Sequence, residues 1–213
     1  MIKNLDIQRA IVLFKEWDNL HKWEKPHPLY INHTFKKAED SLHTAMALFN
    51  LMTNQEINTK VLPNIDYNSS LWIINASYYS MFFMVQVLLA KENKKLPLGT
   101  KDTHKTTFLA FLYYYLIKNS GMEEQKIIRW EDIQKCRLSN ALILYQQAFS
   151  ESEKMLQIDR AKFAALSLQQ EMDRRNELTY QSSKEIELSL AKISLERAKK
   201  FREIILEYLQ TKN

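Results

Sequence analysis

The chain has 213 residues, which is enough for one domain with a sizeable buried core. It contains only two glycines and four prolines, too few turn residues for a many-stranded sheet, so we expect a helical fold. Thirty basic and twenty-five acidic residues, spread along the chain, give a formal net charge of +5. This mild positive charge is compatible with RNA or phosphate binding but does not by itself indicate it.

The N-terminal residues and the cysteine content indicate a compartment. The single cysteine, Cys136, cannot form an internal disulfide, and the polar start Met1–Asp6 lacks the apolar core of a signal peptide. We therefore expect a cytoplasmic protein. Residues 67–90 carry no charged side chain and are long enough to span a bilayer. Because Asn75 and Tyr79 fall on one helical face, we interpret this stretch as the core helix of a soluble protein, with no membrane partner.

The first half of the chain predicts two amphipathic helices before that core helix. The first lies near residues 5–23 and ends before Pro26 and Pro28, because proline cannot continue a helix. The second lies near residues 32–53, where apolar residues repeat at threes and fours. A polar loop that contains Pro63 follows.

A fourth helix is predicted to open at Asp102 or Thr103, either of which can cap free backbone N–H groups, and to run to Gly121. Within it, the triplet Tyr113–Tyr115 covers most of the helix circumference. At least one of these rings should therefore face outward or into a partner.

The second half of the chain predicts two more helices. The fifth covers some or all of residues 130–179, with a break near 157–160. The sixth starts at Ser182, where Ser182–Glu185 has the form of a capping box, and continues to the C-terminal end. Short links between long amphipathic helices favour an all-α fold, an antiparallel up-and-down bundle of about five to six helices.

Three short motifs follow one another along the chain: Ser77–Phe82 with Leu88–Leu89, then Thr103–Lys105 at the start of a helix, then Arg175-Asn176 followed by Tyr180. In this order they resemble the motifs of the HEPN family of small helical domains. The resemblance covers about residues 32–210. Residues 1–26 are then an N-terminal helical extension, and a longer helical insertion lies around 128–157.

The resemblance implies a helical bundle that is commonly paired into a dimer, and in many members a metal-independent RNase. The family motif is an arginine, usually followed by a polar residue, with a histidine a few residues later. Histidine would act as general base or acid, and arginine would hold the scissile phosphate. Arg175 and Asn176 match the first part, whereas Tyr180 takes the place of the histidine. Since tyrosine has a reference pKa near 10, it is a poor base at neutral pH.

His104 is the histidine that the resemblance places near this site. At the start of a helix it suits contact with a phosphate, while the free N–H groups there disfavour the imidazolium. The alternative, which we favour, is a solvated or capping histidine. The candidate catalytic residues are therefore Arg175, Asn176, Tyr180 and His104.

Further residues are candidates for contact with a ligand or phosphate: Tyr79, Lys105, Arg174 and Arg175. Each has a structural alternative, which for Tyr79 is packing at the rim of the core. For the Arg175–Tyr180 motif the alternative is an ion pair and a buried ring. The basic residues of 197–202 are expected to form a solvated face. No histidine spacing supports a metal site, and we expect no cofactor.

Two classes of function follow, with a third alternative. The preferred one is a HEPN-like protein, in a homodimer, that binds nucleotide or RNA with weak or absent nuclease activity. A nucleotidyltransferase would be its partner, as in toxin–antitoxin pairs of this family. The second is a metal-independent RNase with a composite site across the dimer. The third is a protein-interaction scaffold without catalysis.

Overall fold

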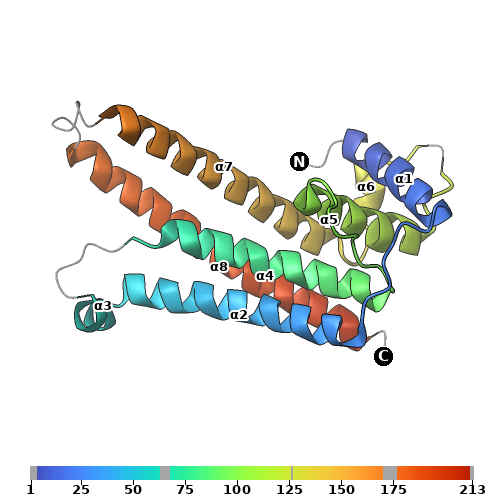
Figure 1. Ribbon diagram of the computed structural model, residues 1–213, viewed down its shortest axis with the longest axis horizontal. Helices are drawn as coiled ribbons and strands as arrows, with labels where there is room; N and C mark the ends of the chain where they lie inside the picture. Colours follow the sequence, from blue (N-terminus) through green and yellow to red (C-terminus); the bar gives the residue numbers. More distant parts are fainter. Residues whose placement is uncertain (1–3, 63–67, 126, 170–176, 212–213) are drawn as a thin grey trace.

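The computed structural model describes residues 4–62, 68–125, 127–169 and 177–211, and their side chains except those of 155–169 and 177–186. Within these ranges the chain is all-α and forms no strand (Figure 1). The eight α-helices that it forms there are α1 (Asn4–Asn19), α2 (Pro28–Thr53), α3 (Gln55–Val61), α4 (Ser70–Lys91), α5 (Thr103–Phe111), α6 (Trp130–Gln134), α7 (Ser139–Gln169) and α8 (Glu177–Gln210). This number exceeds the five to six expected, because α3 is a short helix in a segment without a predicted helix, and the fifth predicted helix is divided into α6 and α7.

Helix α4 is the central element of the molecule. Helices α2 and α8 make its most extensive contacts, and α7 and α5 also pack against it. In Figure 1, α2 and α4 lie side by side and run in opposite directions, as do α7 and α8. Helix α4 is long and apolar enough to cross a membrane, but 72% of its most apolar stretch is buried inside the protein. Its apolar length is therefore used in packing against the neighbouring helices.

Helix α2 begins earlier than the sequence pattern indicated. Its first residue is Pro28, and His27 caps the free N–H groups by accepting a hydrogen bond from the Leu29 backbone N–H at 3.2 Å. Proline is favoured at the first position of a helix, because its fixed φ suits the helix and its missing N–H would have had no partner there. Pro28 therefore starts a helix, although the sequence was interpreted as placing that start near residue 32.

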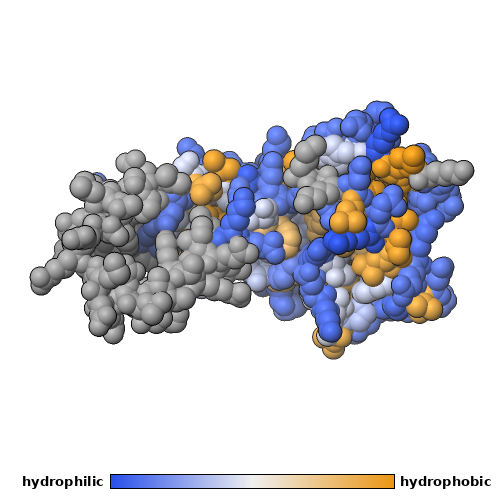
Figure 2. Space-filling model, turned by 90° about the horizontal axis from the view of Figure 1, so that it is seen from above, coloured by the Kyte–Doolittle hydropathy of each residue, from blue (hydrophilic) through white to orange (hydrophobic). Residues whose placement is uncertain are grey.

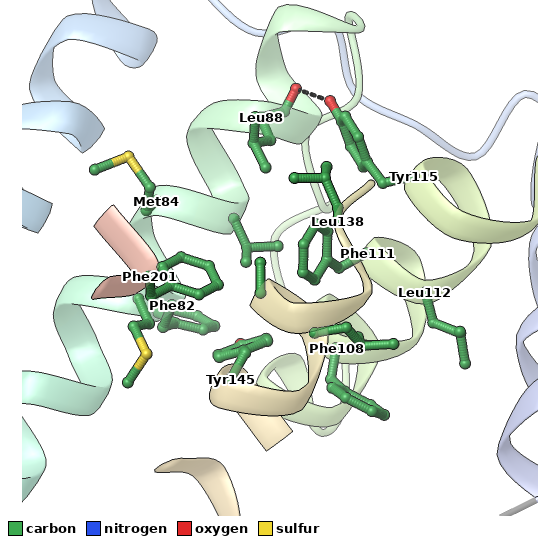
Figure 3. Close-up of a cluster of buried hydrophobic side chains, with 14 of the residues drawn as sticks. Phe82, Met84, Leu88, Phe108, Phe111, Leu112, Tyr115, Leu138, Tyr145 and Phe201 are labelled. Atoms are coloured by element: carbon green, nitrogen blue, oxygen red, sulfur yellow. Dashed lines mark hydrogen bonds between the residues drawn. The ribbon is translucent and has the colours of Figure 1, made fainter. Parts of the chain in front are cut away.

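Aromatic rings from four helices form the core (Figure 3). Tyr145 of α7 contacts Phe108 and Phe111 of α5 and Phe201 of α8, with ring centroids 6.1, 6.4 and 6.1 Å away. The Tyr115 hydroxyl donates a hydrogen bond of 2.6 Å to the Leu88 carbonyl, drawn as a dashed line in Figure 3. Burial of each such large side chain stabilises the fold by about 1.5–3 kcal/mol.

The prediction that one ring of Tyr113–Tyr115 faces outward is wrong, because all three are buried. This segment belongs to η1 (Leu112–Ile117), a π-helical continuation of α5 that is followed by the 3-10 turn η2 (Lys118–Ser120). Tyr115 faces the core, whereas α1 covers the other two rings: Phe14 is completely buried and stacks on Tyr113 at 5.8 Å. The helix is thus enclosed on several sides, which a pattern within one helix does not reveal.

Polar contacts also hold the N-terminal helix in place. The Trp23 indole N–H donates to the Tyr114 hydroxyl at 2.8 Å, and the Tyr114 hydroxyl donates to the Asp18 carboxylate. Lys118 forms an ion pair of 2.8 Å with the same carboxylate. These contacts and the burial of Phe14 make α1 part of the core.

Two predicted helix boundaries in the second half are wrong. No break occurs near 157–160, since α7 is continuous from Ser139 to Gln169, and the interruption falls instead between α6 and α7. Helix α8 begins at Glu177, so Ser182 lies inside it and does not cap it. A capping-box pattern only permits a helix start, and the strong helix formers on both sides of Ser182 allow the helix to continue.

The basic residues of 197–202 are not simply solvated. Arg197 forms an ion pair of 2.6 Å with Glu151 of α7 and is only 11% exposed. Arg202 binds Glu39 of α2 with two hydrogen bonds, of 2.7 and 2.8 Å. The expectation fails for these two arginines, because they join α8 to α7 and to α2.

Seen from above in Figure 2, hydrophilic residues predominate, and the larger hydrophobic areas lie at the end of the molecule that carries α1 and α6.

Candidate functional site

A groove of about 1040 Å³ follows the outer face of α4. Helix α2 forms one wall, and α7 with the first turn of α5 forms the other. We call it the α4 groove. Its volume is in the range of pockets that bind small molecules and cofactors.

The floor of the α4 groove is an aromatic stripe on α4. Trp72, Ala76, Tyr79 and Phe83 recur at helical spacing and all line it. Trp72 is 65% exposed and Tyr79 is 40% exposed, although large apolar side chains are usually buried. The Tyr79 and Phe83 rings stack with centroids 5.9 Å apart. Trp72 therefore lies open on the groove floor and is not packed into the core.

The α2 wall is polar and carries one cation. Lys37 Nζ lies 5.6 Å from the centroid of the Phe83 ring, within the range of a cation–π interaction. Asp40 is engaged by Lys36 at 2.8 Å. The hydroxyls of Ser41 and Thr44 donate to backbone carbonyls of their own helix, at 2.7 and 2.8 Å. Among the described residues, Lys37 is therefore the cation that lines the groove.

The opposite wall contains the pair that joins α4 to α5. The Tyr78 hydroxyl lies 2.7 Å from His104 Nδ1, and the His104 ring lies 4.5 Å from the Phe82 ring. Burial lowers the pKa of His104 below its usual value of 6.5, opposed by the nearby carboxylates of Asp102 and Glu153. Burial also raises the pKa of Tyr78 far above its usual value, so its hydroxyl keeps its proton. Tyr78 therefore donates to Nδ1 of a neutral imidazole, which leaves the proton of the ring on Nε2.

Polar groups of α7 and of the α5 start complete this wall. The Ser152 hydroxyl donates a hydrogen bond of 2.8 Å to the Asn75 side-chain oxygen. The carboxylates of Glu153 and Asp102 also line the groove, and both are exposed. Asp102 precedes α5 with a left-handed φ of 50° and makes no side-chain capping bond, so the cap expected there is wrong. Aspartate is one of the few residues that tolerate this conformation, which here leaves its carboxylate in the groove.

The chemistry of the α4 groove is thus an open aromatic floor between one lysine and several hydrogen-bond acceptors. Among the side chains that the structure describes, three carboxylates line it, from Asp40, Asp102 and Glu153, against one cation, that of Lys37. Such a lining can stack a flat ring and accept its N–H groups. Across the described ranges, no three histidine, cysteine or acidic side chains are placed to hold a metal ion.

The structure brings two of the predicted site residues together. The Tyr79 and His104 rings meet edge to face at 5.7 Å, and both line the groove. Lys105, which follows His104, is partly buried and does not line it. Tyr79 also lies at the rim of the core, which is the alternative that the sequence offered for it, and its neighbour Tyr78 is buried.

The remaining predicted site residues lie wholly or partly outside the described part of the chain. Arg174, Arg175 and Asn176 are outside the described residues. Tyr180 belongs to the first turn of α8, and its side chain is also outside the described range.

The backbone alone separates Tyr180 from His104 within one chain. Helix α7 continues past Glu153 of the groove to Gln169, which is about 24 Å at 1.5 Å per residue. Helix α8 begins at that far end of α7 (Figure 1). A site that joins His104 to Tyr180 would therefore need a second copy of the chain.

Sequence reasoning missed most of the groove walls, above all Lys37, Glu153 and Asn75 as a possible ligand contact. One signal was available: Lys37, Ser41, Thr44 and Leu48 recur at helical spacing on α2 and form a second stripe beside its buried one. The stripe alone does not show that α4 presents aromatic rings beside it.

The fold and the groove define a helical protein with an open groove that has an aromatic floor. No family model matches the chain, and neither a curated protein nor a solved structure matches it.

Proposed function

We propose that this protein is a HEPN-like helical module that binds RNA or a nucleotide, with a base held in the α4 groove and with weak or absent nuclease activity. The fold in this proposal is the antiparallel up-and-down bundle of that family, to which the opposed directions of α2 and α4 and of α7 and α8 lend support.

The observation that carries the proposal is the aromatic floor formed by the exposed rings of Trp72 and Tyr79 and the partly buried ring of Phe83. Proteins that read single-stranded RNA stack its unpaired bases on aromatic side chains and bond their edges. Each such stacking contact contributes about 1–3 kcal/mol. Asn75 and the carboxylates of the α7 wall stand beside the floor, where the edges of a stacked base would lie.

Binding is favoured over cleavage by the same geometry. His104 is held by Tyr78 and its pKa is lowered by burial, so it is neutral and cannot stabilise a phosphate by charge at neutral pH. Asp102 and Glu153, on the wall opposite Lys37, would repel a scissile phosphate placed beside His104, and cleavage requires that phosphate to be held by cations. Tyr180 stands in the histidine position of the motif and is a weak base at neutral pH.

The partners in this proposal follow from the resemblance alone. We place the protein in the cytosol as a homodimer, with a nucleotidyltransferase as its partner. Light scattering of the purified chain tests the dimer, and a nucleotidyltransferase gene beside this one would support the pairing.

Calorimetric titration with a short single-stranded RNA and with mononucleotides, each at two salt concentrations, tests the binding proposal. We expect saturable binding that Trp72→Ala and Tyr79→Ala each weaken about tenfold, because each removes a stacking surface. The matched control is Val12→Ala on α1, which shortens an exposed side chain that does not line the α4 groove and should leave the affinity unchanged. Absence of binding to every RNA and nucleotide would overturn the proposal.

A further inference from the structure

The charged groups of the α4 groove are divided between its two walls. Lys37 stands over Phe83 on the α2 side. On the other side, Asn75 bonds Ser152 of α7 and Tyr78 bonds His104 of α5. On a helix of 3.6 residues per turn, positions 75 and 78 lie to one side of the stripe formed by positions 72, 76, 79 and 83. The two walls therefore face each other across the aromatic floor.

The acidic wall is built to accept hydrogen bonds from a ligand. Glu153 and Asp102 both act on the charge states of His104 and Tyr78, so they lie close to the same edge of the groove. Neither carboxylate forms an ion pair with another described residue, and both are exposed. They are thus free to accept N–H groups from a ligand.

Asn75 adds a donor beside these acceptors. Its side-chain oxygen already accepts the Ser152 hydroxyl at 2.8 Å, so its NH₂ group is the part left for a ligand. An N–H donor next to a carboxylate acceptor matches the edge of adenine or cytosine, which carries a ring-nitrogen acceptor next to an amino donor. Uracil and hypoxanthine carry the reverse order, with a carbonyl where the amino group would be.

Resting on the proposed function, we propose that the α4 groove selects bases whose Watson–Crick edge carries an amino group next to a ring-nitrogen acceptor, adenine or cytosine, and holds the phosphate of the same nucleotide at Lys37. The base stacks on Tyr79 and Trp72, its amino group faces Glu153, and its ring nitrogen accepts from Asn75. A keto base would set its carbonyl oxygen against the Glu153 carboxylate. Discrimination by such paired hydrogen bonds amounts to at least about fivefold in affinity.

The test compares AMP with IMP, which share the ring system and the phosphate and differ in the amino group, by calorimetric titration. We expect the wild-type protein to bind AMP at least about fivefold more tightly than IMP, and CMP more tightly than UMP. Glu153→Gln should narrow the difference between AMP and IMP, because glutamine offers a donor as well as an acceptor. The matched control is Glu131→Gln, which removes an exposed carboxylate on α6 and should leave the difference in affinity between AMP and IMP unchanged.

A second comparison tests Lys37. Lys37→Met should weaken the binding of AMP. It should leave the affinity for adenosine unchanged, because adenosine has no phosphate. Equal affinities of the wild-type protein for AMP and IMP would overturn this inference while leaving the proposed function standing. Failure to bind any nucleotide or RNA would overturn both.

Discussion

The Tyr78 hydroxyl and His104 Nδ1, 2.7 Å apart, join the middle of α4 to the first turn of α5. Tyr78 is buried and stacks on Tyr145 of α7 at 6.0 Å, so this one side chain contacts three helices. The pair fixes the position of the His104 ring at the wall of the α4 groove. The shape of the groove therefore depends on a contact inside the core.

Removal of the Tyr78 hydroxyl should destabilise the protein. In Tyr78→Phe the partly buried His104 Nδ1 loses its hydrogen-bond partner, which costs about 1–3 kcal/mol of unfolding free energy. Urea denaturation followed by circular dichroism measures the change. Tyr79→Phe is the matched control: that side chain is exposed, and its change should stay within about 0.5 kcal/mol. Equal effects of the two substitutions would contradict a structural role for the pair.

His104 should make the stability depend on pH. Its pKa in the folded protein lies below the 6.5 of the unfolded chain, so the unfolded chain binds the proton more readily. The contribution is therefore fully present above about pH 6.5 and is lost as the pH falls from there through the folded pKa. The carboxylates of Asp18 and Glu24 have lowered pKa values, so their contributions are lost in a more acidic range.

Urea denaturation at steps between pH 8 and pH 5 checks this dependence. The wild-type unfolding free energy should fall below pH 6.5 more steeply than that of His104→Gln, in which the group is absent. The other histidines are common to both proteins and cancel in the difference. If the unfolding free energies of the wild-type protein and the variant run parallel over this pH range, His104 has the same pKa in the folded and the unfolded protein, which contradicts the prediction.

Helix α1 should be required for stability. Phe14 is completely buried and contacts the rings of Trp17, Trp23 and Tyr113, so Phe14→Ala should cost about 3–5 kcal/mol. Val12→Ala, which changes a 67% exposed position of the same helix, should cost less than about 0.5 kcal/mol. Thermal and urea unfolding of both variants measure the difference. A small effect of Phe14→Ala would mean that α1 is a detachable extension.

RNA cleavage separates the binding proposal from the RNase alternative. Purified protein should not degrade a structured or a single-stranded RNA in the presence of EDTA, because burial lowers the pKa of His104, which therefore carries no proton to donate from an imidazolium at neutral pH. Arg175→Ala and Tyr180→Phe serve as controls for contaminating nucleases. Cleavage by the wild-type protein that disappears in Arg175→Ala would favour the RNase.

The helices that bury one face were predictable from sequence, and the groove was not. The apolar repeats of α2 and the uncharged length of α4 both indicate helices, because periodic burial follows directly from helical geometry. Trp72 repeats with the same period as the buried residues of α4, so the pattern does not distinguish an open groove floor from a packed face. That distinction depends on which helices lie beside α4, and residues far apart in sequence determine it.

Local patterns failed for the same reason at the tyrosine triplet and at the helix boundaries. Tyr113–Tyr115 is buried because α1, α4 and α8 surround it, and tertiary packing of this kind overrides the expectation from a single helix. At Ser182 the capping sequence competes with helix formers on both sides, and the helix continues. The motif residues Arg175 and Asn176 lie outside the described residues, so their role stays a prediction from the resemblance.

The most direct measurement uses the four tryptophans of the chain as reporters. Trp72 lies on the floor of the α4 groove, whereas Trp17 and Trp23 pack around Phe14, and Trp130 opens α6. Proton–nitrogen correlation spectra of the ¹⁵N-labelled protein, recorded during titration with AMP, resolve the four indole N–H signals, and Trp72→Phe assigns the first. We predict that the Trp72 signal alone moves, in a saturable manner. A titration in which the Trp72 signal stays in place, or in which only the indoles packed around α1 respond, would contradict base binding in the α4 groove.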